Sequence, residues 1–243
     1  MPSEPVVTCH SEVHVWCALL SKAYNPDLIS LLVDDEIIRA GKFHLSRDRE
    51  NFIAARGVLR MLLGRYLNTD PRALRFCYNA YGKPALASEF CSSDLRFNIS
   101  HSNDIAVYAI STGRDLGIDI EYMRPLPDQD SIAEQFFSPK EVADLHSLPL
   151  HLQETAFYTC WTRKEAYIKA MGKGLSIDLD EFDVELRPGL PASLLSVKND
   201  PGEAARWSLQ ELIPADGYVG ALGVEGHDWK LKCWQWQDGY HAS

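Results

Sequence analysis

Two acidic side chains, Asp119 and Glu121, lie two positions apart in the sequence GIDIE at residues 117–121. In a β-strand their carboxylates point to one face, while Ile118 and Ile120 point to the other face and suit a core. Paired carboxylates repel each other unless water or a cation lies between them, and Mg²⁺ is commonly held by one or two carboxylates plus substrate phosphates. The pattern is compatible with a magnesium site, although such a pair alone is more often a solvated strand face.

A second set of residues recurs every four positions in residues 161–169 (WTRKEAYIK). Trp161, Glu165 and Lys169 share one helical face. On a wet surface the Glu–Lys pair would stabilise the helix by roughly a few tenths of a kcal/mol and do nothing more. A tryptophan on an amphipathic helix is usually buried, however, and would bring its charged neighbours to an interior edge. Glu165 could then complete a cation site, and Lys169 could face a phosphate.

Hydroxyl and imidazole groups gather in residues 97–102 (FNISHS), where a short strand is predicted to end. A serine beside a histidine suggests a hydrolase. Ser100 and His101 are adjacent, however, so in a strand they face opposite ways and cannot form a nucleophile–base pair. The sequence also lacks the G-x-S-x-G turn of serine hydrolases. We therefore expect Ser100 and His101, within this cluster of donors, to bind an anion.

Two further features are ambiguous on their own. Residues 81–84 (YGKP) are typical of a turn with an incidental lysine, although the glycine also permits close approach to a flat ligand. The other feature is a basic segment, which comprises Arg39, Lys42, Arg47, Arg49, Arg56, Arg60 and Arg65. Such a run is usually a solvated helix face and is less often an anion site.

The composition excludes several classes of protein. The 243-residue chain carries a formal net charge of −10, which argues against nucleic-acid binding. Its six cysteines form no C-x-x-C pair, which indicates reduced thiols rather than disulfides or a zinc site. A signal peptide and an apolar run of the ~20 residues that span a bilayer are both missing from the sequence. We therefore expect a cytoplasmic protein that binds neither nucleic acid nor membrane.

The spacing of apolar residues predicts an α+β fold in two halves. Helices are predicted over residues 27–32, 34–41, 47–67, 131–136 and 153–171. Strands are predicted over residues 12–19, 75–79, 97–100, 105–111, 116–121, 182–186, 207–212, 218–224 and 230–236. Ser138 and Glu141 form a helix-capping pattern around Pro139. The proline-containing residues 124–130 indicate a linker, so we place the subdomains at residues 1–123 and 124–243.

Five segments occur in an order that is far more specific than any one of them: YGKP (81–84), FNISHS (97–102), GIDIE (117–121), FFSPKE (136–141) and WTRKEAYIKAMGKGL (161–175). Together they resemble the 4′-phosphopantetheinyl transferases of the Sfp-like class over about residues 12–225. The YMRP sequence at residues 122–125 is also similar to the cyanobacterial members. The resemblance implies two similar α+β subdomains arranged as a pseudo-dimer in one monomeric chain. It also implies that coenzyme A and Mg²⁺ bind in the cleft between the subdomains.

The resemblance implies roles for individual residues. Asp119, Glu121 and Glu165 match the metal-binding acids, and Glu165 and Lys169 match the catalytic residues. The residues implied to bind coenzyme A are Arg39, Arg56, Lys83, Pro84, Ser100, His101, Asp119, Lys164 and Lys169. Glu36 falls where the family has another basic residue, so the clamp for the 3′-phosphate, which would include Arg56 and His101, differs here.

These matches imply an enzyme that transfers 4′-phosphopantetheine from coenzyme A to a serine of an apo acyl or peptidyl carrier protein and releases 3′,5′-ADP. Glu165 would remove the proton of the serine, while Mg²⁺ and Lys169 would stabilise the departing pyrophosphate. Carriers of fatty-acid, polyketide and peptide synthesis are all candidates. One alternative is a different Mg²⁺-dependent phosphotransferase or phosphodiesterase. Another is a non-catalytic module that binds coenzyme A or a carrier.

Overall fold

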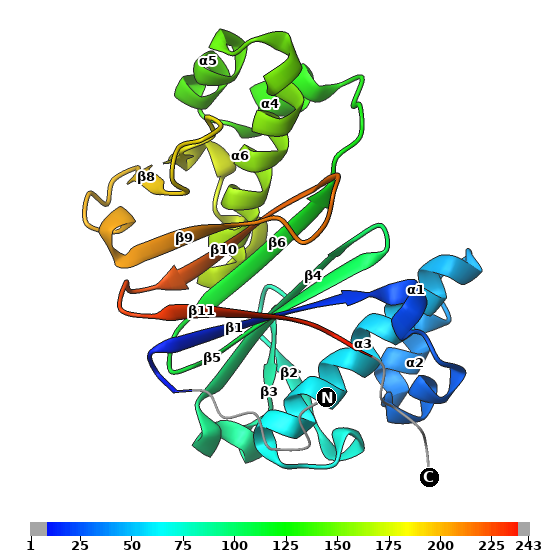
Figure 1. Ribbon diagram of the computed structural model, residues 1–243. Helices are drawn as coiled ribbons and strands as arrows, with labels where there is room; N and C mark the ends of the chain where they lie inside the picture. The colour runs from blue at the N-terminus through cyan, green and yellow to red at the C-terminus, as the bar shows by residue number, and fades with distance from the viewer. Residues whose placement is uncertain (1–8, 238–243) are drawn as a thin grey trace.

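Four layers of secondary structure are stacked in the order helix, sheet, sheet, helix (Figure 1). The computed structural model describes residues 9–237, apart from the side chains of residues 91, 92 and 175. The outer layers are two long helices, and the two sheets face each other between them. The predicted α+β fold is confirmed.

The helices and strands largely follow the predicted ranges. The helices are α1 (Leu20–Ala23), α2 (Asp34–Ala40), α3 (Ser46–Leu67), α4 (Gln129–Phe136), α5 (Pro139–Ser147) and α6 (Leu150–Met171). Short 3₁₀ helices are η1 (Pro26–Leu31), η2 (Pro71–Ala73), η3 (Ser88–Ser93), η4 (Gly174–Ser176), η5 (Leu179–Glu181) and η6 (Ala204–Arg206). The strands are β1 (Glu12–Leu19), β2 (Phe76–Tyr78), β3 (Pro84–Leu86), β4 (Leu95–Ser102), β5 (Ile105–Thr112), β6 (Leu116–Tyr122), β7 (Phe182–Val184), β8 (Leu194–Val197), β9 (Trp207–Leu212), β10 (Tyr218–Glu225) and β11 (Lys230–Gln235). None of the helices in the described part is long and apolar enough to cross a membrane.

The first sheet has the strand order β11-β1-β5-β4 and packs against α3. Its strands alternate between two cores, because successive side chains of a strand point to opposite faces. Trp16 of β1 and Tyr108 of β5 belong to the core shared with α3. The Tyr108 hydroxyl also donates a 3.0 Å hydrogen bond to the carbonyl of Ala55 in α3. Their neighbours Val15 and Val107 belong instead to the core between the two sheets.

The second sheet has the strand order β6-β10-β9 and packs against α6. Ile118 and Ile120 of β6 are buried in the core between the sheets, as the sequence predicted. The short helices α4 and α5 pack against α6 at the top of Figure 1. The predicted helix cap of α5 is confirmed: Ser138 Oγ accepts from the Glu141 amide at 3.2 Å, and Glu141 Oε2 accepts from the Ser138 amide at 2.8 Å.

The sheets are also joined where β4 lies beside β6, although these strands form no backbone ladder with each other. Side chains of β4 accept hydrogen bonds from amides of β6. The three bonds run from the Ile118 amide to Asn98 Oδ1 (2.9 Å), from the Ile120 amide to Ser100 Oγ (3.4 Å) and from the Tyr122 amide to Ser102 Oγ (3.1 Å). We call this row of bonds the β4–β6 seam.

Strand pairing crosses the predicted boundary at residue 123 in both directions. β6, from the first half, pairs with β10 in the second sheet, and β11, from the end of the described chain, runs parallel to β1 in the first sheet. The two halves therefore exchange a strand, as the adjacent β1 and β11 in Figure 1 illustrate. The division into residues 1–123 and 124–243 stays a prediction.

Gly117 sets how closely β6 approaches α6. A β-carbon at this position would collide with the backbone of Ala166 and Ala170 in α6. Neither strand nor helix can move away cheaply, because both are held in a packed layer. Glycine is thus required here for close packing rather than for an unusual backbone conformation.

We expect Gly117→Ala to lower the free energy of unfolding by about 1–3 kcal/mol, the usual effect of overpacking a core. Urea unfolding followed by circular dichroism would measure it. Gly202→Ala is the matched control, because a β-carbon there meets only Asp200 at 3.7 Å. Equal unfolding midpoints for the two variants would contradict the close packing.

Candidate active site

A buried carboxylate and an ammonium group meet between β6 and α6. Lys169 Nζ lies 2.6 Å from Asp119 Oδ1, and Asp119 is only 4% exposed. Ser100 Oγ of β4 donates to the same carboxylate oxygen at 2.8 Å and accepts from Lys169 Nζ at 3.2 Å. Three elements therefore converge on Asp119, and the sequence prediction that Asp119, Ser100 and Lys169 share one site agrees with this geometry.

The other carboxylate oxygen of Asp119, Oδ2, lacks the contacts that hold Oδ1. Asp119 Oδ2 is buried and has no hydrogen-bond partner among the described residues. A buried polar atom without a partner costs about 1–3 kcal/mol, more when it is charged, and is uncommon in folded proteins. An oxygen of this kind is suited to accept a ligand, and a hard cation is the ligand that a carboxylate binds best.

Two more acids, Glu121 and Glu165, interact electrostatically with Asp119. Burial raises the pKa of Glu165, and the charges of Asp119 and Glu121 raise it further while Lys169 opposes them. Burial also raises the pKa of Glu121, against a 2.8 Å hydrogen bond from Ser102 Oγ that lowers it. The acids predicted from two separate motifs therefore lie within electrostatic reach of one another.

The carboxylates of Asp119, Glu121 and Glu165 are suitable ligands for Mg²⁺, although they do not by themselves form a complete metal site. No three His, Cys, Asp or Glu side chains of the described chain lie close enough together to hold a metal ion. Mg²⁺ usually takes only one or two carboxylates and completes its shell with water and substrate phosphate. The unpartnered Asp119 Oδ2 and the neighbouring Glu121 and Glu165 supply oxygen donors of the right kind.

The face of α6 that carries these charges is half-buried, as the sequence predicted. Trp161, Glu165 and Lys169 all have intermediate exposure. The indole of Trp161 packs edge-on against Phe136 of α4, with ring centroids 5.8 Å apart. A partly buried tryptophan has thus brought a glutamate and a lysine to the interior edge of the helix.

A cationic edge flanks the cluster. His101 is exposed, and its pKa is lowered first by partial desolvation and then by the positive charges of Lys169 and Arg39. The guanidinium of Arg39 also lies over the ring of Phe52, 5.5 Å from its centroid. Arg39, His101 and Lys169 could together bind an anion next to Asp119.

Arg56 lies in a different environment. The residue is 9% exposed, and its guanidinium donates to Glu36 Oε1 at 2.8 Å, while Arg60 donates to Glu36 Oε2 at 2.7 Å. Both guanidinium groups also lie 5.1 Å from the ring centroid of Phe76. Glu36, for which the sequence resemblance implies a departure from the family pattern, therefore neutralises part of this charge. A contact between Arg56 and the 3′-phosphate stays a prediction.

Lys83 and Pro84 line a pocket of about 340 Å³ beside the C-terminal end of α6. Lys83 Nζ donates to the carbonyls of Leu116 and Ala170, both at 3.1 Å, and burial lowers its pKa to about 8. Lys83 thus ties the β2–β3 hairpin to β6 and α6. Its ammonium keeps one donor for a ligand, so a role in binding coenzyme A stays a prediction.

The expectation for Lys164 is not supported by its position. The side chain is 1% exposed, and Nζ lies 2.7 Å from Glu141 Oε2. It also donates to the carbonyls of Leu179 at 2.7 Å and Phe182 at 2.6 Å. All three donors of the ammonium are therefore used inside the second core. Lys164 holds that core together and offers no donor to a cofactor.

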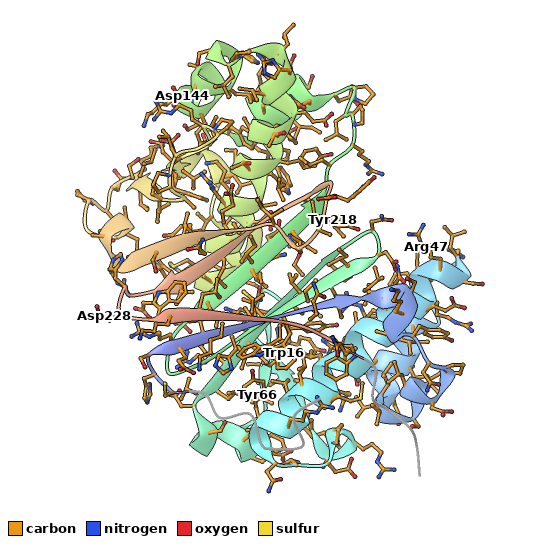
Figure 2. The ribbon with its side chains drawn as sticks, in the orientation of Figure 1. Trp16, Arg47, Tyr66, Asp144, Tyr218 and Asp228 are labelled. Atoms are coloured by element: carbon orange, nitrogen blue, oxygen red, sulfur yellow. The ribbon has the colours of Figure 1, made fainter. Side chains whose placement is uncertain are left out.

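Two pockets meet at the open side of the cluster, and both are lined by Ser102 and Asn103. One, of about 450 Å³, extends from Glu121 toward the aromatic side chains of α6. The other, of about 460 Å³, extends toward α3 and includes Arg47, which Figure 2 shows at the outer edge of the molecule. The Arg47 guanidinium donates to Asn103 Oδ1 at 2.8 Å. The sequence did not predict the residues that line these two pockets, because they come from segments far apart in the chain.

Comparison with known proteins places both halves in one family. Residues 21–113 match the N-terminal domain of 4′-phosphopantetheinyl transferases, and residues 115–223 match the 4′-phosphopantetheinyl transferase superfamily. The chain is 41% identical over 239 residues to the 4′-phosphopantetheinyl transferase HetI of Nostoc sp., covering 97% of this chain and 98% of that protein. It is 33% identical to the transferase Sfp of Bacillus subtilis, covering 69% and 72%. A solved complex of Chronobacterium ammoniagenes ACPS with CoA is similar at 19% identity and a TM-score of 0.35, covering 46% of this chain and 95% of that chain.

Breaking the buried pair of Lys164 and Glu141 should destabilise the fold strongly. We expect Lys164→Ala to lose about 3–5 kcal/mol of unfolding free energy, because it leaves a buried carboxylate without its partner. Urea unfolding would measure this, with the exposed Lys140→Ala on the same pair of helices as control. If Lys164→Ala instead kept its stability and lost coenzyme A binding, the prediction from sequence would be restored.

The raised pKa of Glu165 predicts how the stability of the protein changes with pH. The folded state binds more protons than the unfolded chain between 4.5 and the raised pKa, so stability falls as pH rises through this window. Glu165→Gln removes that penalty and should be more stable than the wild type at neutral pH. The difference should shrink and disappear as the pH falls below 4.5.

Thermal or urea unfolding across this pH range would test the expectation for Glu165. Glu134→Gln, on the exposed face of α4, is the matched control and should change stability little at any pH. A Glu165→Gln protein that is less stable than wild type at neutral pH would show that the glutamate stabilises the folded state.

Proposed function

The chain belongs to the 4′-phosphopantetheinyl transferase superfamily, and from this premise we propose that it is a Mg²⁺-dependent enzyme that modifies apo carrier proteins. The serine oxygen of an acyl or peptidyl carrier forms a bond to the phosphorus that bears pantetheine. The pyrophosphate bond of coenzyme A breaks, and 3′,5′-ADP leaves. The observation that carries the proposal is the cluster of Asp119, Ser100 and Lys169, in which an unpartnered carboxylate oxygen lies beside a fixed ammonium group.

The acids of this cluster would hold the metal. Asp119 contributes the unpartnered oxygen, and Glu121 and Glu165 contribute the nearby carboxylates. Bound by them, Mg²⁺ would neutralise the charge that develops on the pyrophosphate as its bond breaks. The burial of Asp119 supports the proposal, because electrostatic interactions are stronger where water is excluded.

Glu165 acts as the general base in this proposal. A base is most effective when its pKa is close to the working pH, provided that it stays ionised. Burial and the neighbouring acids raise the pKa of Glu165 in that direction. The proton of the carrier serine passes to Glu165 directly or through one water, and the oxygen then attacks phosphorus. No covalent intermediate with the enzyme is required.

The cations of the site bind coenzyme A and stabilise the leaving group. Lys169 is fixed by Asp119 and Ser100, so it needs little reorganisation to interact with a phosphate. Arg39 and His101 flank it and would bind the 3′-phosphate side of the nucleotide. Lys83 and Pro84 would contact the nucleotide from the pocket at the end of α6.

The partner is an apo acyl carrier protein or a carrier domain of a fatty-acid, polyketide or peptide synthase. Arg47 and Arg49, exposed at the start of α3, provide a basic surface next to one of the pockets, which suits an acidic carrier. A monomer in the cytoplasm is part of the proposal, because one chain supplies every charged residue of the site.

Purified protein incubated with coenzyme A, Mg²⁺ and an apo carrier should add the mass of one phosphopantetheine group to the carrier, as measured by intact mass spectrometry. EDTA and Glu165→Ala should abolish the gain. We expect Lys169→Ala to slow it by about 10²–10³-fold, the usual effect of losing one preorganised charge-stabilising group. Lys173→Ala, which changes an exposed lysine just after α6, is the control and should react normally.

The alternatives give different results in the same assay. A non-catalytic module would bind coenzyme A by calorimetry yet leave every carrier unmodified. A general phosphodiesterase would release nucleotide from coenzyme A at the same rate with and without a carrier. Either outcome, with several carriers tested, would overturn the proposed function.

A further inference from the structure

The β4 side chains of the β4–β6 seam contact β6 in a repeating pattern. Ser102 Oγ accepts from the Tyr122 amide at 3.1 Å and donates to Glu121 Oε2 at 2.8 Å. Ser100 Oγ behaves in the same way, accepting from the Ile120 amide at 3.4 Å and donating to Asp119 Oδ1 at 2.8 Å. Each serine therefore binds the backbone of β6 and the acid that immediately precedes that amide.

The third position of the seam lacks an acid. Asn98 Oδ1 accepts from the Ile118 amide at 2.9 Å, and the residue that precedes this amide is Gly117, which has no side chain. Asn98 can therefore fix the register of the two strands without orienting any carboxylate. The seam thus contains one position that is purely structural and two that also contact the candidate metal-binding acids.

A serine hydroxyl has a single proton to donate. At Ser102 this proton points to Glu121, because the backbone amide of Tyr122 approaches one of the lone pairs of the hydroxyl. Among the described residues, Ser102 is the only side chain that hydrogen-bonds to Glu121. The orientation of that carboxylate therefore depends on the seam, and the seam is set by strand register.

We propose that Ser102 is a positioning residue of the transferase, one that holds Glu121 in the orientation in which it shares a divalent cation with Asp119. The inference rests on the proposed function, and it assigns to Ser102 a role separate from that of Ser100, which also contacts Lys169. Hydrogen-bond partners of metal-binding carboxylates typically change metal affinity by about 10–100-fold when they are removed. Ser102 also lines both pockets, so it lies where substrates meet the acids.

The test measures Mn²⁺ binding to the full chain by electron paramagnetic resonance, with coenzyme A present and without a carrier. Ser102→Ala should weaken Mn²⁺ binding by about 10-fold or more. Ser102→Thr keeps a hydroxyl and should stay within about threefold of the wild type, since the hydrogen bond to Glu121 is retained. Asn98→Ala breaks the equivalent seam bond and Ser111→Ala removes a buried hydroxyl bonded to the Arg114 carbonyl; both should keep the wild-type affinity.

Urea unfolding of the same variants separates positioning from a loss of structure. Ser102→Ala and Asn98→Ala should both unfold at lower urea than the wild type, because each leaves a β6 amide without its acceptor. Equal Mn²⁺ affinities for these two folded variants would overturn the positioning role. A wild-type protein that binds no Mn²⁺ would overturn the proposed metal site as well. Ser102→Cys, which keeps the size of the side chain, replaces the alanine variant if that one does not fold.

Discussion

The placement of β6 is the constraint on which the rest of this protein depends. It is fixed by the ladder with β10, by the side chains of β4, and by α6, whose backbone comes so close that only Gly117 fits. Because a strand alternates its side chains, holding β6 in this way buries Ile118 between the sheets and directs Asp119 toward α6. The same contacts that join the two sheets therefore present the acids, and the stability of the fold and the geometry of the site cannot be varied independently.

Two lysines of α6 show how burial separates structural from chemical roles. Lys164 and Lys169 both pair with a carboxylate, at 2.7 Å and 2.6 Å. Lys164 is enclosed and uses every donor, so its pair with Glu141 offsets desolvation and fixes the second core. The side chain of Lys169 remains 30% exposed, and its partner Asp119 keeps one oxygen without a hydrogen bond. A buried polar atom without a hydrogen bond lowers the stability of the fold. A ligand that supplies the missing interaction would restore that stability.

Prediction from sequence succeeded where the pattern is local. The alternation around Asp119 predicted β6 and the shared face of its acids, and the four-residue spacing of Glu165 and Lys169 predicted their shared, half-buried face of α6. The position of Lys164 does not support its predicted role in binding a cofactor, because adjacent helical residues point about 100° apart and only tertiary packing decides which of them is enclosed. The parallel pairing of β11 with β1 could not be predicted either, since strands from opposite ends of a chain leave no local sequence signal of their pairing. Motif order compensated for this by identifying the family.

Glu36 changes the electrostatics on the α3 side of the molecule. Two guanidinium groups, those of Arg56 and Arg60, share its one carboxylate, so the buried group keeps one net positive charge. Arg60 Nη2 is buried and has no hydrogen-bond partner among the described residues, which indicates that the carboxylate does not saturate the pair. Glu36 therefore restrains Arg56, and a direct contact between Arg56 and an anionic ligand stays a prediction. The net positive charge of Arg56, Arg60 and Glu36 gives this side of the molecule a preorganised positive potential, which attracts an anion without requiring a direct contact.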